Sequence, residues 1–332
     1  MTGIVIQQQR PIDAICLGRA GVDLYAREAN TDIEEVSGFD KYVGGSPANI
    51  AVALAKLGAK AGIISCVSDD GLGRYVQHYL NQQGVDIKGI QVLGNGTRTS
   101  LAVTEMKANG CEVVLYRNNA ADLSLAISHI DKSYIASAKA LVVTGTALSS
   151  SPSREATLQA ISFAREVGTL VVLDVDYRAY SWNSAEESAL YYQMAAAQSD
   201  ILIGNREEFD VLETLIDPGN KDDDLSAKRF LTNETQVVVI KAGELGSKIY
   251  TRWGEQFSQG IFPVEVKKPF GSGDSFAGAL LYALLNDLGL SMGVKMGSAA
   301  AAINVSGDSC TEAMPTLAEL NAFIAEREQQ NN

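Results

Sequence analysis

The residues best suited to catalysis or binding form a glycine turn that leads into an apolar helix near the C-terminal end of the chain. Gly271, Ser272 and Gly273 make up the turn, and Asp274 opens the helix. Glycine adopts backbone angles that other residues avoid, and aspartate is a good helix starter. A helix N-terminus presents free N–H groups and the positive end of the helix dipole, so this turn is a candidate anion site.

Asp274 indicates what such an anion site could do. A carboxylate repels a bound phosphate, so it is an odd choice for binding alone. It is a sensible choice for a general base that takes the proton from a hydroxyl group attacking the phosphorus. The alternative is a plain N-capped helix after a glycine-serine loop, which is a common arrangement. These residues alone do not decide between the two interpretations.

The composition is that of an ordinary globular protein and excludes some partners. The chain has 332 residues, 46% of them hydrophobic, and a net charge of −13, which argues against binding nucleic acid or an anionic membrane surface. No stretch reaches the ~18 apolar residues that a spanning helix needs. The first ten residues show no signal-peptide pattern, and the four cysteines are widely spaced. We therefore expect a cytoplasmic protein with reduced, mostly buried thiols.

The elements that position these residues alternate between apolar strands and helices. Strands are expected at residues 12–17, 61–67, 140–144, 170–174, 201–204 and 236–241, with edge strands at 248–251 and 255–266. Helices are expected at residues 50–57, 71–83, 153–167, 186–197 and 206–215, directly after Asp274, and finally at 292–305, with a charged loop at 217–224. This alternation predicts an α/β fold, a doubly wound, mostly parallel sheet flanked by helices.

One region departs from the alternation. Residues 97–106 and 111–116 favour two strands joined around Ala108, Asn109 and Gly110, which is a good hairpin signal. We expect a single domain over residues 1–332, with a small β extension from about 19–45 and 94–118.

Polar and glycine residues follow the carboxyl ends of the predicted strands, which is the edge where such sheets bind ligands. They are Asp23, Gly44, Gly45, Asn49, Asp174, Asp176, Arg178, Asn205, Glu208, Lys241, Gly243, Gly246 and Asp274. Simpler explanations exist for single members: Asp23 could cap a turn, and Arg178 could pair with a neighbouring aspartate. Asn205 and Glu208 could form a helix capping box.

Several common motifs are missing from the chain. It has no Gly-x-x-x-x-Gly-Lys-Ser/Thr loop, and no Gly-x-Gly-x-x-Gly follows the first strand. It also lacks a Gly-x-Ser-x-Gly elbow with a plausible histidine partner. P-loop, NAD-dependent oxidoreductase and serine hydrolase interpretations are therefore unsupported.

Two signatures resemble those of the ribokinase-like, or PfkB, carbohydrate kinases. They are Gly-Gly-Ser-Pro-Ala-Asn at residues 44–49 and Phe-Gly-Ser-Gly-Asp-Ser-Phe-Ala-Gly at residues 270–278. The Asn-Arg-Glu-Glu segment at residues 205–208 is similar to the Asn-x-x-Glu element of the family. The resemblance covers about residues 12–325. Further stretches, at residues 18–25, 44–51, 176–178 with Trp182, and 309–315, look like a branch of the family that phosphorylates a sugar acid of inositol breakdown.

The sequence departs from the family pattern at two places. Many relatives have alanine where Ser272 stands, a change that keeps the backbone N–H. Many have Pro-Asn where Val175 and Asp176 stand, which leaves the role of Asp176 open.

The resemblance implies transfer of the γ-phosphate of ATP to a primary hydroxyl of a sugar acid, with Asp274 as the base. The amides from Gly271 to Asp274 would hold the charge that builds on the phosphate. Mg²⁺ would bridge the nucleotide phosphates and be placed by Asn205 and Glu208, mainly through water. A monovalent cation such as K⁺ is a further expectation.

The resemblance also assigns binding residues. Sugar hydroxyls would bind Asp23, Gly44, Gly45 and Asn49, the substrate carboxylate would bind Arg19, Arg117 or Arg178, and the nucleotide would lie near Lys241, Gly243, Gly246 and Asn205. The β extension would be a lid that excludes water and pairs two subunits into a homodimer. Two alternatives stay open: a related kinase for 2-keto-3-deoxygluconate, fructose or a nucleoside, and a non-catalytic sugar-binding protein, which Asp274 argues against.

Overall fold

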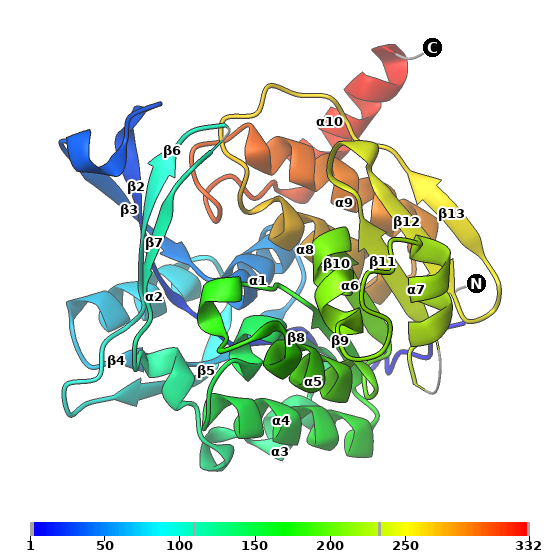
Figure 1. The fold of residues 1–332 in the computed structure, drawn as a ribbon, viewed down its shortest axis with the longest axis horizontal. Coiled ribbons are helices and arrows are strands. Elements are labelled where there is room, and N and C mark those ends of the chain that lie inside the picture. The colour runs from blue at the N-terminus through cyan, green and yellow to red at the C-terminus, as the bar shows by residue number, and fades with distance from the viewer. Residues whose placement is uncertain (1–2, 109, 232–233, 331–332) are drawn as a thin grey trace.

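The computed structural model describes residues 3–108, 110–231 and 234–330, and a nine-stranded sheet forms its centre (Figure 1). In spatial order the strands are β13 (Gln256–Gln259), β12 (Ser247–Thr251), β11 (Val237–Lys241), β10 (Ile201–Asn205), β9 (Leu170–Asp174), β8 (Ala138–Thr144), β1 (Ile12–Leu17), β4 (Ala61–Ser68) and β5 (Asp86–Leu93). Only β12 and β13 pair antiparallel to their neighbours. The prediction of a mostly parallel, doubly wound sheet is confirmed.

Helices cover both faces of the sheet. One face packs against α1 (Ser46–Lys56), α2 (Gly71–Gln82), α8 (Ser272–Leu285) and α9 (Leu290–Val305), and α10 (Leu317–Gln330) packs on α8 and α9. The other face packs against α3 (Lys132–Ala136), α4 (Ser153–Val167), α5 (Ala185–Ala196), α6 (Arg206–Glu213) and α7 (Asp223–Phe230). Among the described residues, none of the helices combines the length and apolarity that crossing a bilayer requires.

The central strands are apolar along their whole length because both of their faces are covered. In β1, Ile15 and Leu17 belong to one core, whereas Ala14 and Cys16 belong to the other, and all four are fully buried. Successive side chains of a strand point to opposite faces, so one strand contributes to both cores. The four cysteines are free thiols, and only Cys111 is not buried.

A second, smaller sheet stands apart from the central sheet, at the upper left of Figure 1. Its strands lie in the order β3 (Phe39–Gly44), β2 (Gly21–Ala29), β6 (Leu101–Met106) and β7 (Val113–Tyr116). They fall within the two segments that the sequence analysis set apart, although β6 and β7 are shorter than expected. Asn109 of the expected hairpin turn lies outside the described residues.

The sequence analysis missed β5 and α7. Strand β5 is an edge strand whose residues are mostly only half-buried, so its sequence lacks a clear apolar run. Helix α7 overlaps the expected charged loop at residues 217–224. Its acidic residues are a helix start, because the Asp222 side chain accepts hydrogen bonds from Asp224 N and Leu225 N.

Two further expectations near the C-terminal end are wrong. The helix expected at residues 292–305 is not the last one, because α10 follows it. Within the described part of α10 only Leu320 and Ile324 are buried, which makes its apolar periodicity weak. The edge strand expected at residues 255–266 ends at Gln259, before Pro263, which has no N–H group for a strand ladder.

Candidate active site

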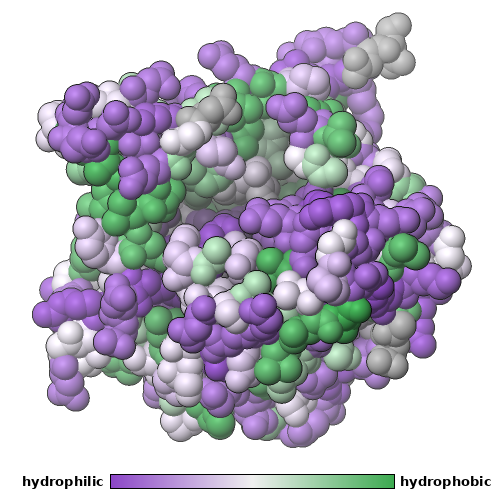
Figure 2. Space-filling view, viewed as in Figure 1, coloured by the Kyte–Doolittle hydropathy of each residue, from purple (hydrophilic) through white to green (hydrophobic). Residues whose placement is uncertain are grey.

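A cleft of about 240 Å³ lies between the second sheet and the carboxyl edge of the central sheet, and Figure 2 shows the surface hollowed there. Its lining includes Asp23 from β2, Asp176 from the segment after β9, and Asp274 from the start of α8. Parallel strands end at the same edge, so segments far apart in sequence meet at this cleft.

The Asp274 carboxylate lies where two helix N-termini converge. Its Oδ1 accepts a hydrogen bond from Ser46 Oγ at 2.6 Å, and its Oδ2 accepts one from Asn49 Nδ2 at 2.7 Å. Both donors belong to the first turn of α1, and Asp274 belongs to the first turn of α8. The two helices approach closely because Gly278 has no side chain, since a Cβ there would lie 2.6 Å from Ala53 Cβ. Both oxygens of Asp274 are thereby fixed in direction.

The environment of Asp274 tunes its basicity. Burial raises the pKa of this carboxyl to about 6, and the nearby Asp176 charge adds to the effect. The hydrogen bonds from Ser46 and Asn49, and the charge of Arg178, oppose the rise. Asp274 is therefore ionised at neutral pH yet more basic than an exposed aspartate, which suits a general base.

The turn before α8 is built for an anion. Gly271 has φ of 88°, and a Cβ there would lie 2.6 Å from Asn304 Oδ1, so only glycine fits. A Cβ on Gly273 would lie 3.2 Å from Lys241 Nζ, so the Lys241 ammonium lies directly against the turn. The N–H groups of the first helical turn, including that of Ser272, have no partner within the helix. A helix N-terminus and a cation thus face the same place.

Acidic groups outnumber cations around this turn. Lys241 Nζ lies 3.6 Å from Asp174 Oδ1. Burial raises the pKa of Asp174 to about 7, the Lys241 charge opposes this, and the carboxylates of Glu208, Asp176 and Asp274 add to it. Burial disfavours the charge on Lys241, yet the same carboxylates, Asp174 foremost, raise its pKa overall. The excess of negative charge favours a bound cation.

Asn205 and Glu208 form the helix capping box that was the simpler explanation for them. The Asn205 side chain accepts from Glu208 N at 2.9 Å, and Glu208 Oε2 accepts from Asn205 N at 2.6 Å. Glu208 Oε1 accepts from Tyr177 N at 3.1 Å. Each oxygen keeps a further lone pair for a water molecule.

These oxygen donors fit Mg²⁺ in one particular way. Mg²⁺ prefers oxygen ligands and keeps several of its waters. Within the described residues, no group of three or more His, Cys, Asp or Glu side chains is arranged to hold a metal ion. The site therefore fits a Mg²⁺ ion held through water and substrate phosphates, and does not fit an ion enclosed by protein ligands.

Of the four residues expected to bind the sugar, Asp23, Gly45 and Asn49 line the cleft, and Gly44 directly precedes Gly45 in the chain. Asp23 is buried, and a Cβ on Gly44 would lie 2.0 Å from its Oδ2, so Gly44 cannot carry a side chain. Gly45 precedes α1 with φ of 104°. Asn49 Oδ1 is buried without a hydrogen-bond partner, which leaves an acceptor free for a hydroxyl group.

All three candidate arginines line the cleft, but they differ in freedom. The Arg19 guanidinium contacts Asp23 at 3.0 Å, and the Arg117 guanidinium contacts Asp122 at 2.6 Å. Both side chains are nearly buried, at 12% and 7% exposure. Arg178 contacts Asp176 at 2.9 Å but its side chain is 48% exposed, so its guanidinium can still reach a ligand.

Eight of the expected residues are not part of the cleft lining: Gly44, Lys241, Asn205, Glu208, Gly243, Gly246, Ser272 and Gly273. Gly243 and Gly246 bound the short turn η6 (Gly243–Leu245) between β11 and β12, each with positive φ. They follow Lys241 in the chain, at the same sheet edge as the anion turn.

The sequence analysis did not single out several residues of the cleft. Ser46 lies inside the segment at residues 44–49, so its position next to Asn49 could have been noticed. Thr146 donates to Asp176 Oδ2 at 3.1 Å, and Asp176 has the strained φ of 38°. Cys310 also lines the cleft. Nothing local in the sequence marks Thr146. Cys310 lies in the stretch at residues 309–315 that resembles the family branch, but only folding brings it to the cleft.

Comparisons with known proteins agree on one family. Residues 12–317 match the model of the pfkB family carbohydrate kinases. A protein of Photobacterium profundum named 5-dehydro-2-deoxygluconokinase is 63% identical over 329 residues, which cover 99% of both chains. A protein of Geobacillus kaustophilus with the same name is 46% identical over 100% of this chain and 98% of its own.

The fold has solved counterparts. A chain from E. coli, assigned as Ribokinase II and solved in complex with ATP and Mg²⁺, superposes with a TM-score of 0.85. The match covers 95% of this chain and 99% of that one at 24% sequence identity. At that identity the likeness establishes the fold.

Proposed function

The chain belongs to the pfkB family of carbohydrate kinases, and we propose that it transfers the γ-phosphoryl group of ATP to the primary hydroxyl of 5-dehydro-2-deoxy-D-gluconate. The substrate is taken from the two relatives that share this name at 63% and 46% identity. The observation that carries the chemistry is the Asp274 carboxylate, held at the N-terminus of α8 beside the anion turn.

Asp274 is the general base of the proposed reaction. Ser46 and Asn49 hold both of its oxygens, so the carboxylate is oriented before the substrate arrives. It accepts the proton of the attacking hydroxyl group as the oxygen bonds to phosphorus. Its pKa of about 6 keeps it ionised at neutral pH and basic enough for this step.

The turn before α8 stabilises the transferring phosphoryl group. Free N–H groups from Gly271 to Asp274 and the Lys241 ammonium all face the place where negative charge builds. Mg²⁺, held through water by Asn205 and Glu208, would neutralise charge on the nucleotide phosphates.

Arg178 is the residue proposed to bind the substrate carboxylate. Its guanidinium is half exposed at the cleft, whereas Arg19 and Arg117 are nearly buried against their own aspartates. A planar guanidinium can bind a carboxylate through two parallel hydrogen bonds. Arg19 and Arg117 then support the cleft wall through Asp23 and Asp122.

The second sheet is proposed to act as a lid and as a dimer contact. It contributes Asp23 to the cleft, so its movement would open or close the site. Its edge strand β7 exposes Val113 at 42% and Tyr116 at 60%. An exposed edge strand with apolar side chains readily pairs with another chain. Light scattering should therefore give twice the 35.4 kDa of one chain.

A coupled assay of ADP release over a panel of acceptors tests the proposed function. The panel contains 5-dehydro-2-deoxygluconate, 2-keto-3-deoxygluconate, fructose and a nucleoside, each with ATP and Mg²⁺. We expect the highest kcat/KM on 5-dehydro-2-deoxygluconate. Higher kcat/KM on a neutral sugar would overturn the substrate but keep the kinase, and no turnover on any acceptor would overturn the proposal.

The variant Arg178→Met sharpens the same assay. It should raise the KM for the sugar acid about tenfold through the lost bidentate contact, while the KM for fructose stays unchanged. Equal changes for both acceptors would remove Arg178 from carboxylate recognition.

A further inference from the structure

A lysine lies fully buried next to the anion turn, and the proposed mechanism does not use it. Lys268 has 0% exposure and is among the largest fully buried side chains of the described residues. Its Nζ donates to Phe270 O at 2.9 Å and to Asn304 Oδ1 at 2.8 Å. Both acceptors are neutral oxygens.

The Lys268 charge is not neutralised locally. Its neighbour Lys267 is half exposed and pairs with Asp308 at 2.9 Å, whereas Lys268 forms no ion pair with any carboxylate of the described residues. Burial lowers the pKa of Lys268, and the more distant Cys310 and Asp274 oppose this. A buried ammonium without a counter-charge costs stability, so hydrophobic packing alone does not explain a lysine at this position.

The contacts of Lys268 lead directly to the anion turn. The carbonyl of Phe270 and the N–H of Gly271 belong to the same peptide group, so a hydrogen bond to the carbonyl polarises that N–H and strengthens it as a donor. Asn304 Oδ1, the second acceptor, lies 2.6 Å from where a Gly271 Cβ would be. The Asn304 amide in turn donates to Cys310 O at 2.8 Å. Lys268 and Asn304 therefore clamp the turn from behind.

We propose that Lys268 is a positioning residue whose buried ammonium acts as a built-in monovalent cation for the anion turn, so that phosphoryl transfer needs no added K⁺. The ammonium is compact, singly charged and coordinated by a main-chain carbonyl and an amide oxygen, as a bound monovalent ion would be. This inference rests on the proposed function. It replaces the expectation of a bound cation such as K⁺ with a side chain of this protein.

A binding experiment tests how well the anion turn binds an analogue of the phosphoryl group, without any sugar present. Calorimetry compares Mg·ADP with Mg·ADP plus aluminium fluoride, an analogue of the transferring phosphoryl group, in the wild type, Lys268→Met and the control Lys267→Met. We expect Lys268→Met to bind Mg·ADP with the affinity of the wild type. The increase in affinity that aluminium fluoride gives should be smaller by about tenfold or more. The control should match the wild type. An unchanged gain in Lys268→Met would overturn the proposal even if the substrate assignment is correct.

A rate experiment tests the cation itself, on the best acceptor of the panel. At constant ionic strength the wild type should turn over equally in K⁺, NH₄⁺ and tetramethylammonium. Lys268→Ala should lose about a hundredfold in kcat with little change in KM, and NH₄⁺ or methylammonium should restore about tenfold. Activation of the wild type by K⁺, or no rescue of a folded Lys268→Ala by any small cation, would contradict a built-in cation. Circular dichroism and thermal melting establish that the variant is folded.

Discussion

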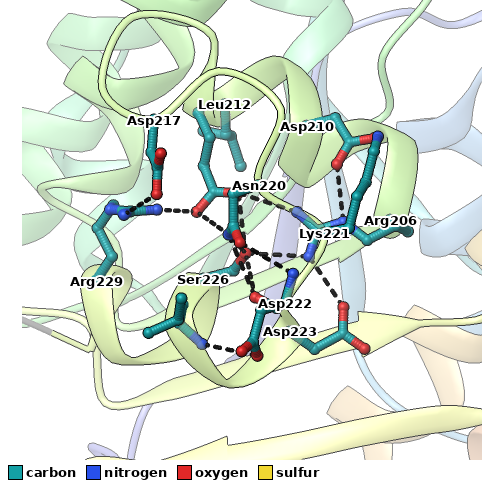
Figure 3. Close-up of polar contacts among 12 residues, drawn as sticks. Arg206, Asp210, Leu212, Asp217, Asn220, Lys221, Asp222, Asp223, Ser226 and Arg229 are labelled. Atoms are coloured by element: carbon teal, nitrogen blue, oxygen red, sulfur yellow. Dashed lines mark hydrogen bonds and ion pairs between the residues drawn. The ribbon is translucent and has the colours of Figure 1, made fainter.

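Two buried carboxylates of this chain, Glu213 and Asp274, lie in opposite electrostatic environments. Glu213, at the end of α6, is 1% exposed and contacts both Arg206 and Arg229. Asn220 and Ser226 also donate to it, and Figure 3 shows these four partners among the polar contacts drawn there. Asp274 at the cleft instead receives two neutral hydrogen bonds and has further carboxylates nearby.

This difference in charge compensation distinguishes a cluster that stabilises the fold from a cluster that can take part in a reaction. A buried carboxylate with two arginines and further donors is compensated, and removing one partner of such a pair is costly. Around Asp274 the compensation is incomplete, which is why the pKa values of Asp274 and Asp174 rise to about 6 and about 7. Perturbed groups in a cleft mark functional sites, whereas the Glu213 cluster fastens a loop to a helix.

The largest expected effect is that of Asp274→Asn. The amide cannot take a proton, so kcat should fall about a thousandfold, while ATP binding is kept. Because a raised pKa means that the ionised form destabilises the folded state, the free energy of unfolding at pH 7 should rise by about 1 kcal/mol. Steady-state kinetics and urea titration measure both. Near-normal turnover would remove Asp274 from the base role.

Glu213→Gln should have the opposite effect to Asp274→Asn, because it should lower stability and leave turnover unchanged. It leaves two arginines around an uncharged side chain, so the free energy of unfolding should fall by about 3 kcal/mol. The kinetic constants should stay unchanged, because Glu213 does not line the cleft. Glu207→Gln, an exposed position on the same helix, is the matched control in urea denaturation. A loss of kcat in folded Glu213→Gln would erase the distinction between the two clusters.

Glu208 has both a structural and a functional place, because it caps α6 and also faces the acidic site. Glu208→Gln should raise the Mg²⁺ concentration for half-maximal activity about fivefold, through the lost charge behind the water-held ion. It should also weaken the cap by about 1 kcal/mol. A Mg²⁺ titration with Glu207→Gln as control checks this. An unchanged titration would leave Glu208 with the cap alone.

The smallest effect is the pH dependence of the wild type. kcat/KM should fall below an apparent pKa of about 6, because protonated Asp274 cannot accept the hydroxyl proton. Between about pH 4 and 6 the folded protein holds a proton on Asp274 that the unfolded chain releases, so this group favours folding as activity is lost. Melting temperatures measured across the same pH range distinguish a loss of activity through protonation of Asp274 from a loss through unfolding. An activity profile that follows unfolding would contradict the assignment.

The sequence allowed much of this structure to be predicted, and its failures have common causes. The central strands and α4 were predictable because continuous apolar runs, helical periodicity and the cap at Gly168 are local signals. Strand β5 and helix α10 were missed because each buries few of its side chains. Asn205 and Glu208 were ambiguous because one pair of side chains suits both a capping box and a metal site.

By itself, the sequence determined the class of fold, the anion turn before α8 and the family, because glycine placement, helix caps and hydrophobic periodicity act over a few residues. Only the tertiary structure decided that Ser46 and Asn49 hold Asp274, that Arg178 is the freer arginine, and that Lys268 is buried behind the turn. Those facts depend on which distant segments pack together and on how far each charge is removed from water.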